Sequence, residues 1–161
     1  KYIYTVPILK IMSLDKRGAP TLNQSETRIK DLTCKERIKE SLRSRGEDFE
    51  RFITAYMGEL SEEDESIIDE FYNYGLSIDM VSMGTFKDMK KPYLRYQLSW
   101  GGPSDEINFY QNGKIEYRFL DWFDGSSLDI TGLEWAQWLR DYLIDVDLIN
   151  DSAFLDAWEV E

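Results

Sequence analysis

The segment of residues 93–124 most constrains the fold, because its alternating side chains predict three consecutive antiparallel strands joined by short loops. The second of these loops is the Gln-Asn-Gly sequence at positions 111–113. A three-residue hairpin loop suits it, since Gly113 can take the left-handed conformation without a Cβ clash. That loop places Phe109 opposite Ile115, so apolar side chains face each other across the hairpin.

A two-residue Asn-Gly turn is the alternative, but it would pair Phe109 with Glu116 and mix apolar with charged positions. A half-buried sheet resists such mixing, because its side chains alternate between the two faces. The three-residue loop instead places Asn108 opposite Glu116 and Glu106 opposite Arg118. One face of the sheet is therefore predicted to be core and the other polar. In the strand before the hairpin the same alternation predicts a core set of Leu94, Tyr96, Leu98 and Trp100.

The N-terminal half of the chain is predicted to be helical. A capping box of Thr33 and Glu36 opens a helix that we expect to end near Gly46. A second helix is expected over residues 47–57. A third begins at Ser61 with acidic residues in its first turn, where they complement the helix dipole.

The C-terminal half is predicted to complete an α+β fold. Residues 76–81 alternate as a first strand, and a capping box of Thr131 and Glu134 opens a final amphipathic helix over one face of the sheet. The expected architecture is a four-stranded antiparallel β-meander packed with helices. The expected regions are an N-terminal arm at 1–24, a helical region at 25–74, and the sheet with the C-terminal helix at 75–161. We expect the last two regions to form one compact domain.

Composition limits the possible chemistry. The chain of 161 residues contains no histidine and a single cysteine, Cys34. The lack of histidine excludes Ser-His and Cys-His catalysis, and one cysteine excludes an internal disulfide and a cysteine-based zinc site. No run of about 18 apolar residues could span a bilayer, so we expect a cytoplasmic protein that does not use the membrane. Any catalysis must rely on carboxylates, lysine, tyrosine or a metal ion.

Charge is unevenly distributed along the chain. Residues 1–60 contain 12 Lys and Arg against 9 Asp and Glu, whereas residues 61–161 contain 7 against 22, which gives the net charge of -12. An acidic surface repels phosphate within a Debye length of about 8 Å at physiological salt. We therefore expect weak or no binding of free nucleic acid, and a basic partner protein is the easier expectation.

Five carboxylates gather along the predicted polar face and at the end of its last strand: Asp79, Glu106, Glu116, Asp121 and Asp124. Mg²⁺ prefers carboxylate oxygens and water, and two or three converging carboxylates can hold an ion that activates water for phosphodiester cleavage. Alternation puts Glu116 and Asp124 on one face and excludes Asp121, unless the strand bulges or ends first. We therefore expect a Mg²⁺ site of Glu116, Asp124 and Asp79. The open alternative is a solvated polar face with Glu106 in a cross-strand charge pair.

Two further motifs carry weaker signals. The Gly-Gly-Pro-Ser sequence at 101–104 lacks the P-loop lysine and does not lead into a helix, so it is typical of a tight strand connection. The aromatic side chains of Tyr93, Tyr110, Trp122 and Phe123 could stack bases or anchor a protein partner. Aromatic residues at alternating spacing are, however, more typical of a core.

The runs YGLSIDMV, YLRYQLSWGGPSDEINFY and KIEYRFLDWFDG resemble a family of small proteins of phages and conjugative elements, and within it type II-A anti-CRISPR proteins. The resemblance covers residues 74–125 and is most specific in the WGGPSDE and DWFDG motifs. Such a protein disables the effector nuclease by truncating its guide RNA, so the resemblance implies effector-dependent RNA cleavage. The catalytic carboxylates that it implies are Glu116, Asp121 and Asp124.

We therefore expect an anti-CRISPR protein that inhibits a type II CRISPR effector nuclease by metal-dependent truncation of its guide RNA. In this mechanism Glu116 and Asp124 bind the ion and Asp121 orients water. Arg95 or Arg118 contacts phosphate. One alternative is a non-enzymatic inhibitor whose acidic helix and tail imitate nucleic-acid phosphates and block a basic groove. Another is an accessory protein of a mobile element that binds an unrelated host factor.

Overall fold

The computed structural model describes residues 32–58, 61–87 and 89–157, and the predicted arm at 1–24 lies outside these ranges. The described part has an α+β fold with four helices and one antiparallel sheet of five strands. The helices are α2 (Cys34–Met57), α3 (Glu62–Tyr72), α4 (Glu134–Asp145) and α5 (Asp151–Asp156). The strands are β1 (Ser77–Val81), β2 (Tyr93–Ser99), β3 (Ser104–Tyr110), β4 (Ile115–Asp121) and β5 (Asp124–Asp129).

The sheet is a meander in the order β1-β2-β3-β4-β5, and all neighbouring strands are antiparallel. The predicted register of the β3–β4 hairpin is confirmed, because Phe109 lies opposite Ile115. Gly113 has a φ of 85°, which is the left-handed conformation that the three-residue loop requires. The pattern of apolar alternation therefore specifies both the hairpin loop and the two faces of the sheet.

The prediction of four strands is wrong by one, because it omits β5. The DGSSLD sequence of this strand contains a single apolar side chain, Leu128, and most of its residues are exposed. It therefore lacks the signals of a half-buried strand. Pairing with β4 defines it instead, from Glu116 opposite Asp129 to Asp121 opposite Asp124.

Helix α2 is one continuous helix of 24 residues, so the predicted break at Gly46 is wrong. Gly46 is buried, and a Cβ at this position would lie 3.2 Å from the indole nitrogen of Trp135 in α4. The glycine thus allows the two helices to approach closely, at a cost to helix propensity of about 1 kcal/mol. The predicted capping box of Thr33 and Glu36 is confirmed at the start of α2.

The other helices begin close to the predicted positions. Ser61 caps α3 as expected, and its side chain accepts the Asp64 N–H. Helix α4 begins at Glu134, but the predicted Thr131 cap is wrong, because the Thr131 hydroxyl instead accepts the Ile115 N–H at 2.9 Å. The short helix α5 was not predicted, and it contributes one buried side chain, Phe154, to the core.

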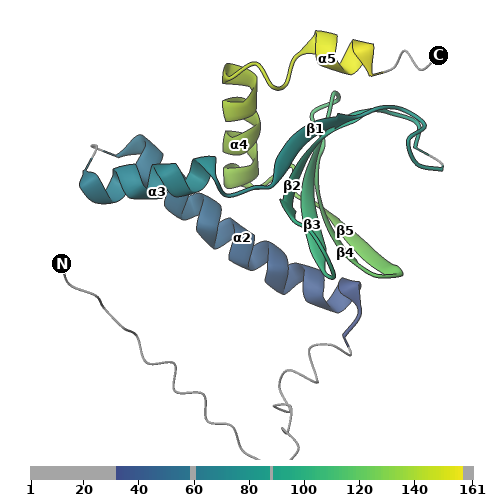
Figure 1. Cartoon of the computed structure of the whole chain (residues 1–161), viewed down its shortest axis with the longest axis horizontal. Coiled ribbons are helices and arrows are strands. Elements are labelled where there is room, and N and C mark those ends of the chain that lie inside the picture. The colour runs from purple at the N-terminus through teal and green to yellow at the C-terminus, as the bar shows by residue number, and fades with distance from the viewer. Residues whose placement is uncertain (1–31, 59–60, 88, 158–161) are drawn as a thin grey trace, which may run out of the picture. The chain divides into compact units, whose positions relative to one another are not determined.

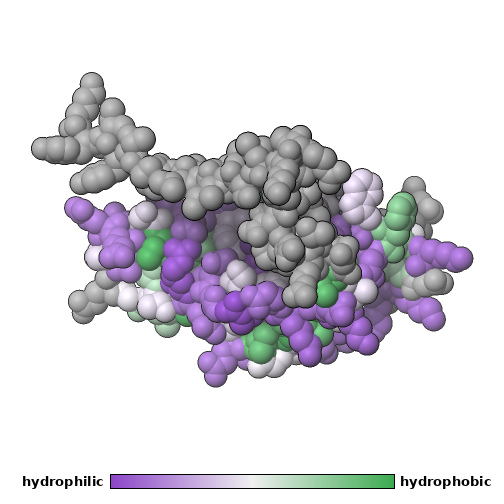
Figure 2. Space-filling model, turned by 90° about the horizontal axis from the view of Figure 1, so that it is seen from below, coloured by the Kyte–Doolittle hydropathy of each residue, from purple (hydrophilic) through white to green (hydrophobic). Residues whose placement is uncertain are grey.

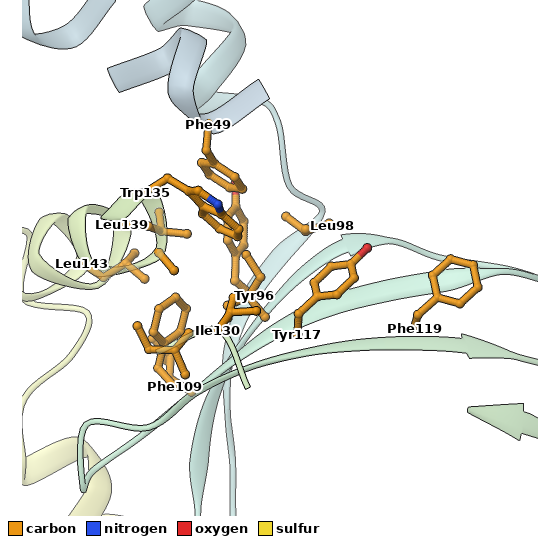
Figure 3. Close-up of a cluster of buried hydrophobic side chains, with 14 of the residues drawn as sticks. Phe49, Tyr96, Leu98, Phe109, Tyr117, Phe119, Ile130, Trp135, Leu139 and Leu143 are labelled. Atoms are coloured by element: carbon orange, nitrogen blue, oxygen red, sulfur yellow. The ribbon is translucent and has the colours of Figure 1, made fainter. Parts of the chain in front are cut away.

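Helices α2 and α4 cover the apolar face of the curved sheet (Figure 1). In the close-up of the core, Trp135 of α4 lies against Phe49 of α2 (Figure 3). Leu139 and Leu143, also of α4, point toward the sheet. The Phe49 and Trp135 rings stack with centroids 5.0 Å apart. Each fully buried large side chain of this kind contributes about 1.5–3 kcal/mol to stability, so this layer holds the helices on the sheet.

The coloured part of the surface in Figure 2 is mostly hydrophilic, with hydrophobic side chains in small separate patches. Within the described ranges, no helix combines the length and the apolar composition needed to cross a membrane. The sheet face opposite α2 and α4, which we call the polar face, carries Arg95, Glu106 and Arg118. It forms the floor of the site described next.

Candidate functional site

A cleft of about 570 Å³ opens on the polar face, at the end where the β2–β3 and β4–β5 connections meet. Its floor includes the side chains of Arg95, Glu106 and Arg118. A cavity of this volume is in the range of small-ligand sites, and it combines apolar walls with a few convergent polar groups. We therefore treat this aromatic-walled cleft as the candidate site.

Three aromatic side chains form the walls of the cleft. Phe86 comes from the β1–β2 connection, Trp100 from the β2–β3 connection and Trp122 from the β4–β5 turn. Trp100 is 77% exposed and Trp122 is 87% exposed. Large exposed aromatic side chains of this kind are typical of surfaces that bind a ligand or a partner.

The exposure of Trp100 corrects the sequence prediction that it belongs to the core set. The register of β2 shifts between Gln97 and Ser99, and the strand ends at Ser99. Trp100 therefore no longer follows the alternation that buries Leu98. The bulge and the strand end turn its indole toward the cleft instead.

Trp122 occupies the tight turn between β4 and β5 in the left-handed conformation, with a φ of 52°. Its indole lies against Gly102, where a Cβ would approach the indole nitrogen to 3.1 Å. Glycine at this position thus lets the β4–β5 turn rest on the β2–β3 connection. This contact explains why both connections line one cleft.

Glu106 is the carboxylate in the floor of the cleft and is only 4% exposed. Its Oε1 accepts hydrogen bonds from Arg118 Nη1 and Asn108 Nδ2, both at 3.2 Å. Its Oε2 lies 4.0 Å from Arg95 Nη1, a separation too long for a hydrogen bond. Arg95 is held from the other side by Asp79, in a two-point contact of 3.1 and 2.8 Å. The floor is thus a charged network with acceptor capacity left on Glu106.

Asn108 continues this network beneath Glu106. It is fully buried, and its Oδ1 has no hydrogen-bond partner among the described residues. Buried polar atoms are nearly always paired, so such an atom calls for an explanation. Its place next to Glu106 makes it part of the polar network that lies beneath the cleft.

The structure does not bring together the three carboxylates expected to bind Mg²⁺. Glu116 lies on the polar face and pairs with Lys114 at 2.5 Å. Asp79 lies on the same face but three strands away, a separation of about 14 Å at the usual strand spacing. Asp124 lies on the opposite face. Among the described residues, no group of three histidine, cysteine or acidic side chains could hold a metal ion.

The prediction that Glu116 and Asp124 share a face is wrong because strand β4 ends at Asp121. A two-residue turn then reverses the chain, and Asp124 pairs directly with Asp121. Directly paired residues point to the same face of a sheet. Asp121 and Asp124 therefore lie together on the side of α2, away from the cleft floor.

Both of these aspartates hold the start of α2. The Asp124 carboxylate accepts the Cys34 N–H at 2.6 Å, and Asp121 pairs with Arg37 at 2.5 Å. The hydrogen bond from the Cys34 N–H lowers the pKa of Asp124, and the nearby Arg37 charge adds to this effect. Negative charge at a helix N-terminus is stabilising, so the geometry gives these residues a structural role.

This role predicts a difference between two substitutions of Asp124. Asp124→Asn keeps a side-chain oxygen that can accept the Cys34 N–H, whereas Asp124→Ala leaves that donor unpaired. We expect thermal unfolding at neutral pH to show a larger loss of Tm for the alanine variant. Because the pKa of Asp124 is lowered in the folded protein, its contribution is present above pH 4 and is lost as the pH falls through the folded pKa. Equal Tm values for the two variants would contradict the capping role.

The sequence prediction identified part of the cleft. Arg95 and Arg118, expected to contact phosphate, and Trp122, named as a possible stacking side chain, do line the cleft. Phe86 carried no signal, Trp100 was predicted to be core, and Glu106 was not among the residues expected to bind the ion. One signal was available. The WGGPSDE motif spans the connection between two strands of a hairpin. Trp100 and Glu106 lie at the two ends of this motif, so they can approach each other only at that end of the hairpin.

Comparison with protein-family models, with curated proteins and with solved structures gives no match to this chain. No relative therefore assigns a role to the cleft.

Proposed function

We propose that this protein is an anti-CRISPR inhibitor of a type II effector nuclease, and that it captures the effector's guide RNA in the aromatic-walled cleft. One observation carries the proposal. The WGGPSDE and DWFDG motifs, on which the resemblance to anti-CRISPR proteins rests, both line this cleft, through Trp100 and Trp122. Pairing of β3 with β4 brings the two motifs together, and the largely exposed indoles that they supply are available to a ligand.

The side chains of the cleft fit single-stranded RNA. Proteins that bind single strands stack bases on aromatic side chains, with about 1–3 kcal/mol per base, and contact the backbone through cationic groups. Trp100 and Trp122 supply exposed stacking surfaces, and Arg95 and Arg118 supply the cations. The net charge of -12 opposes capture of free RNA. The effector complex is therefore the expected source of the strand.

Capture is favoured over metal-dependent cleavage by the placement of the carboxylates. Glu106 is the acidic side chain in the cleft floor, whereas Asp121 and Asp124 hold α2 on the other side of the sheet. The residues expected to bind Mg²⁺ do not fit one ion, so no cleavage step is derived from them. Recovery of the guide RNA on a gel also tests for its truncation.

The second candidate function is imitation of nucleic-acid phosphates. Its support is the first turn of α3, which exposes Glu62, Glu63 and Glu65 side by side. A row of carboxylates on one helix can bind a basic groove of the effector through many weak attractions. This alternative predicts loss of inhibition when these three side chains are neutralised together.

We expect Arg118→Gln to lower the potency of inhibition about tenfold or more, since hydrogen bonds to charged groups contribute about 1.5–3 kcal/mol. The measurement is DNA cleavage by the guided effector over a titration of this protein, followed by recovery of the guide RNA on a denaturing gel. Arg140→Gln is the matched control, because the Arg140 side chain is equally exposed, at 32%, but lies on α4 and pairs with Asp141.

The same titration separates the candidates. Full potency of Arg118→Gln, together with a large loss in the variant E62Q/E63Q/E65Q, would replace RNA capture with phosphate imitation. Failure of the unmodified protein to inhibit any guided type II effector would overturn the proposal as a whole. Recovery of shortened RNA would add cleavage to capture and direct attention to the carboxylate of Glu106.

A further inference from the structure

The free acceptor on Glu106 has consequences for which base the cleft can hold. Within the described ranges, Oε1 of Glu106 takes both hydrogen bonds from Arg118 and Asn108, while Oε2 has its nearest cation at 4.0 Å. A carboxylate is an acceptor only, so a ligand facing it must present N–H groups. A buried carboxylate that keeps an unused oxygen beside an open cavity is therefore a selective element.

The charges around Glu106 decide between two kinds of ligand. Aromatic walls around a carboxylate can hold a cationic side chain. Here, however, Glu106 lies beside Arg95 and Arg118, and Asp79 is paired with Arg95, so the floor has no uncompensated carboxylate to balance a further cation. A neutral base with an attached phosphate needs no such counter-charge. The floor therefore favours a nucleotide over a lysine or arginine of a partner protein.

The four RNA bases differ in what they present to an Arg–Glu floor. The Watson–Crick edge of guanine carries two adjacent donors, N1–H and N2–H, next to the acceptor O6. Adenine and cytosine each place a ring acceptor next to their amino group, and uracil has acceptors on both sides of N3–H. Unstacked bases are read on these edges. Guanine offers two adjacent donors to the carboxylate and O6 to a neighbouring arginine, whereas adenine and cytosine offer the carboxylate a single amino group.

On the basis of the proposed function, we infer that the cleft selects guanine, with Glu106 accepting from N1–H and N2–H. Arg95 or Arg118 donates to O6 in this arrangement. The indoles of Trp100 and Trp122 cover the faces of the base. The stacking surfaces are indifferent to base identity, so selectivity comes from Glu106.

The test uses the intrinsic fluorescence of the tryptophans during titration with GMP, AMP, CMP and UMP at equal ionic strength. Correct edge pairing discriminates between bases by about tenfold or more, and we expect GMP to bind tighter than the other three by this factor. Inosine monophosphate lacks the N2 amino group. It should lose most of the advantage of GMP, which tests the inference without altering the protein.

Glu106→Gln should reduce the preference for GMP to within about threefold, because the amide replaces one acceptor with a donor. Glu116→Gln is the matched control, since Glu116 lies on the same polar face but does not line the cleft. Thermal unfolding of each variant checks that it is folded. A guanine preference that is unchanged in Glu106→Gln would overturn the role of Glu106.

The outcomes distinguish this inference from the proposed function. Equal binding of all four nucleotides would overturn guanine selectivity and leave RNA capture standing. If none of the four nucleotides binds, guanine selectivity is overturned, whereas RNA capture is overturned only in the DNA-cleavage titration, by full potency of Arg118→Gln. A GMP preference that is weakened by inosine monophosphate and lost in Glu106→Gln supports both.

Discussion

Replacement of Asp105 by asparagine is expected to lower the free energy of unfolding by about 3 kcal/mol, the lower end of the cost of breaking a buried ion pair. Asp105 is 2% exposed and lies on the apolar face of the sheet. Its carboxylate accepts two hydrogen bonds from Arg45 of α2, at 2.8 and 3.0 Å, and one from Tyr117 at 2.7 Å. The substitution leaves the partly exposed Arg45 guanidinium without its counter-charge.

The same group predicts how stability depends on pH. Burial by itself raises the pKa of Asp105, but hydrogen bonds from Arg45, Ser99 and Tyr117 outweigh it and lower the pKa below its usual value. The folded protein therefore binds this proton less readily than the unfolded chain. The contribution of Asp105 is complete above about pH 5 and is lost as the pH falls through the lowered pKa.

Urea unfolding at neutral and acid pH measures both effects. Asp141→Asn is the control, because Asp141 pairs with Arg140 on the exposed surface of α4, where such pairs contribute about 0–1 kcal/mol. Tyr117→Phe should cost about 2 kcal/mol, because the hydroxyl donates to the Asp105 carboxylate and also shares a hydrogen bond with Ser41. An Asp105→Asn variant as stable as the control, with the acid dependence of the unmodified protein, would show that Asp105 is not the link between α2 and the sheet.

The double variant Trp100→Ala/Trp122→Ala is expected to lower the potency of effector inhibition by about a hundredfold or more. Base stacking on an aromatic side chain contributes about 1–3 kcal/mol per base, and the double variant removes two such surfaces. Both indoles are largely exposed, so their loss opens no cavity in the core and the fold should survive. The DNA-cleavage titration described above measures the change.

Phe123→Ala is a closely matched control for this prediction. Phe123 is adjacent to Trp122 in the β4–β5 turn and is fully exposed, at 103%, but it does not line the cleft. Loss of exposed aromatic surface in general would weaken both variants equally. Inhibition that depends on Phe123 as strongly as on the two tryptophans would show that the turn itself, and not the cleft, contacts the effector.

The β3–β4 hairpin shows how much of the fold could be predicted from the sequence. Its loop, its register and the polar character of one sheet face all follow from two local rules: alternation with period two, and the need for glycine at a positive φ. The start of α2 follows similarly from the capping box of Thr33 and Glu36. Features of this kind depend on residues close together in the chain, so the sequence determines them by itself.

The tertiary structure decided what depends on contacts between distant residues. The sequence predicts a helix end at Gly46, but this residue lies inside α2. The indole of Trp135 in α4 occupies the space that a side chain at position 46 would need. Alternation placed Asp124 on the polar face with Glu116, but the β4–β5 turn pairs it with Asp121, and both aspartates lie on the face of α2.

The alternation along β2 predicts that Trp100 is buried, but the strand ends at Ser99 and Trp100 is exposed. The sequence by itself determined four strands of the sheet and its polar face. The cleft depends on the tertiary structure, because a bulge at the end of β2 and the contact of the β4–β5 turn with the β2–β3 connection place Trp100 and Trp122 beside it.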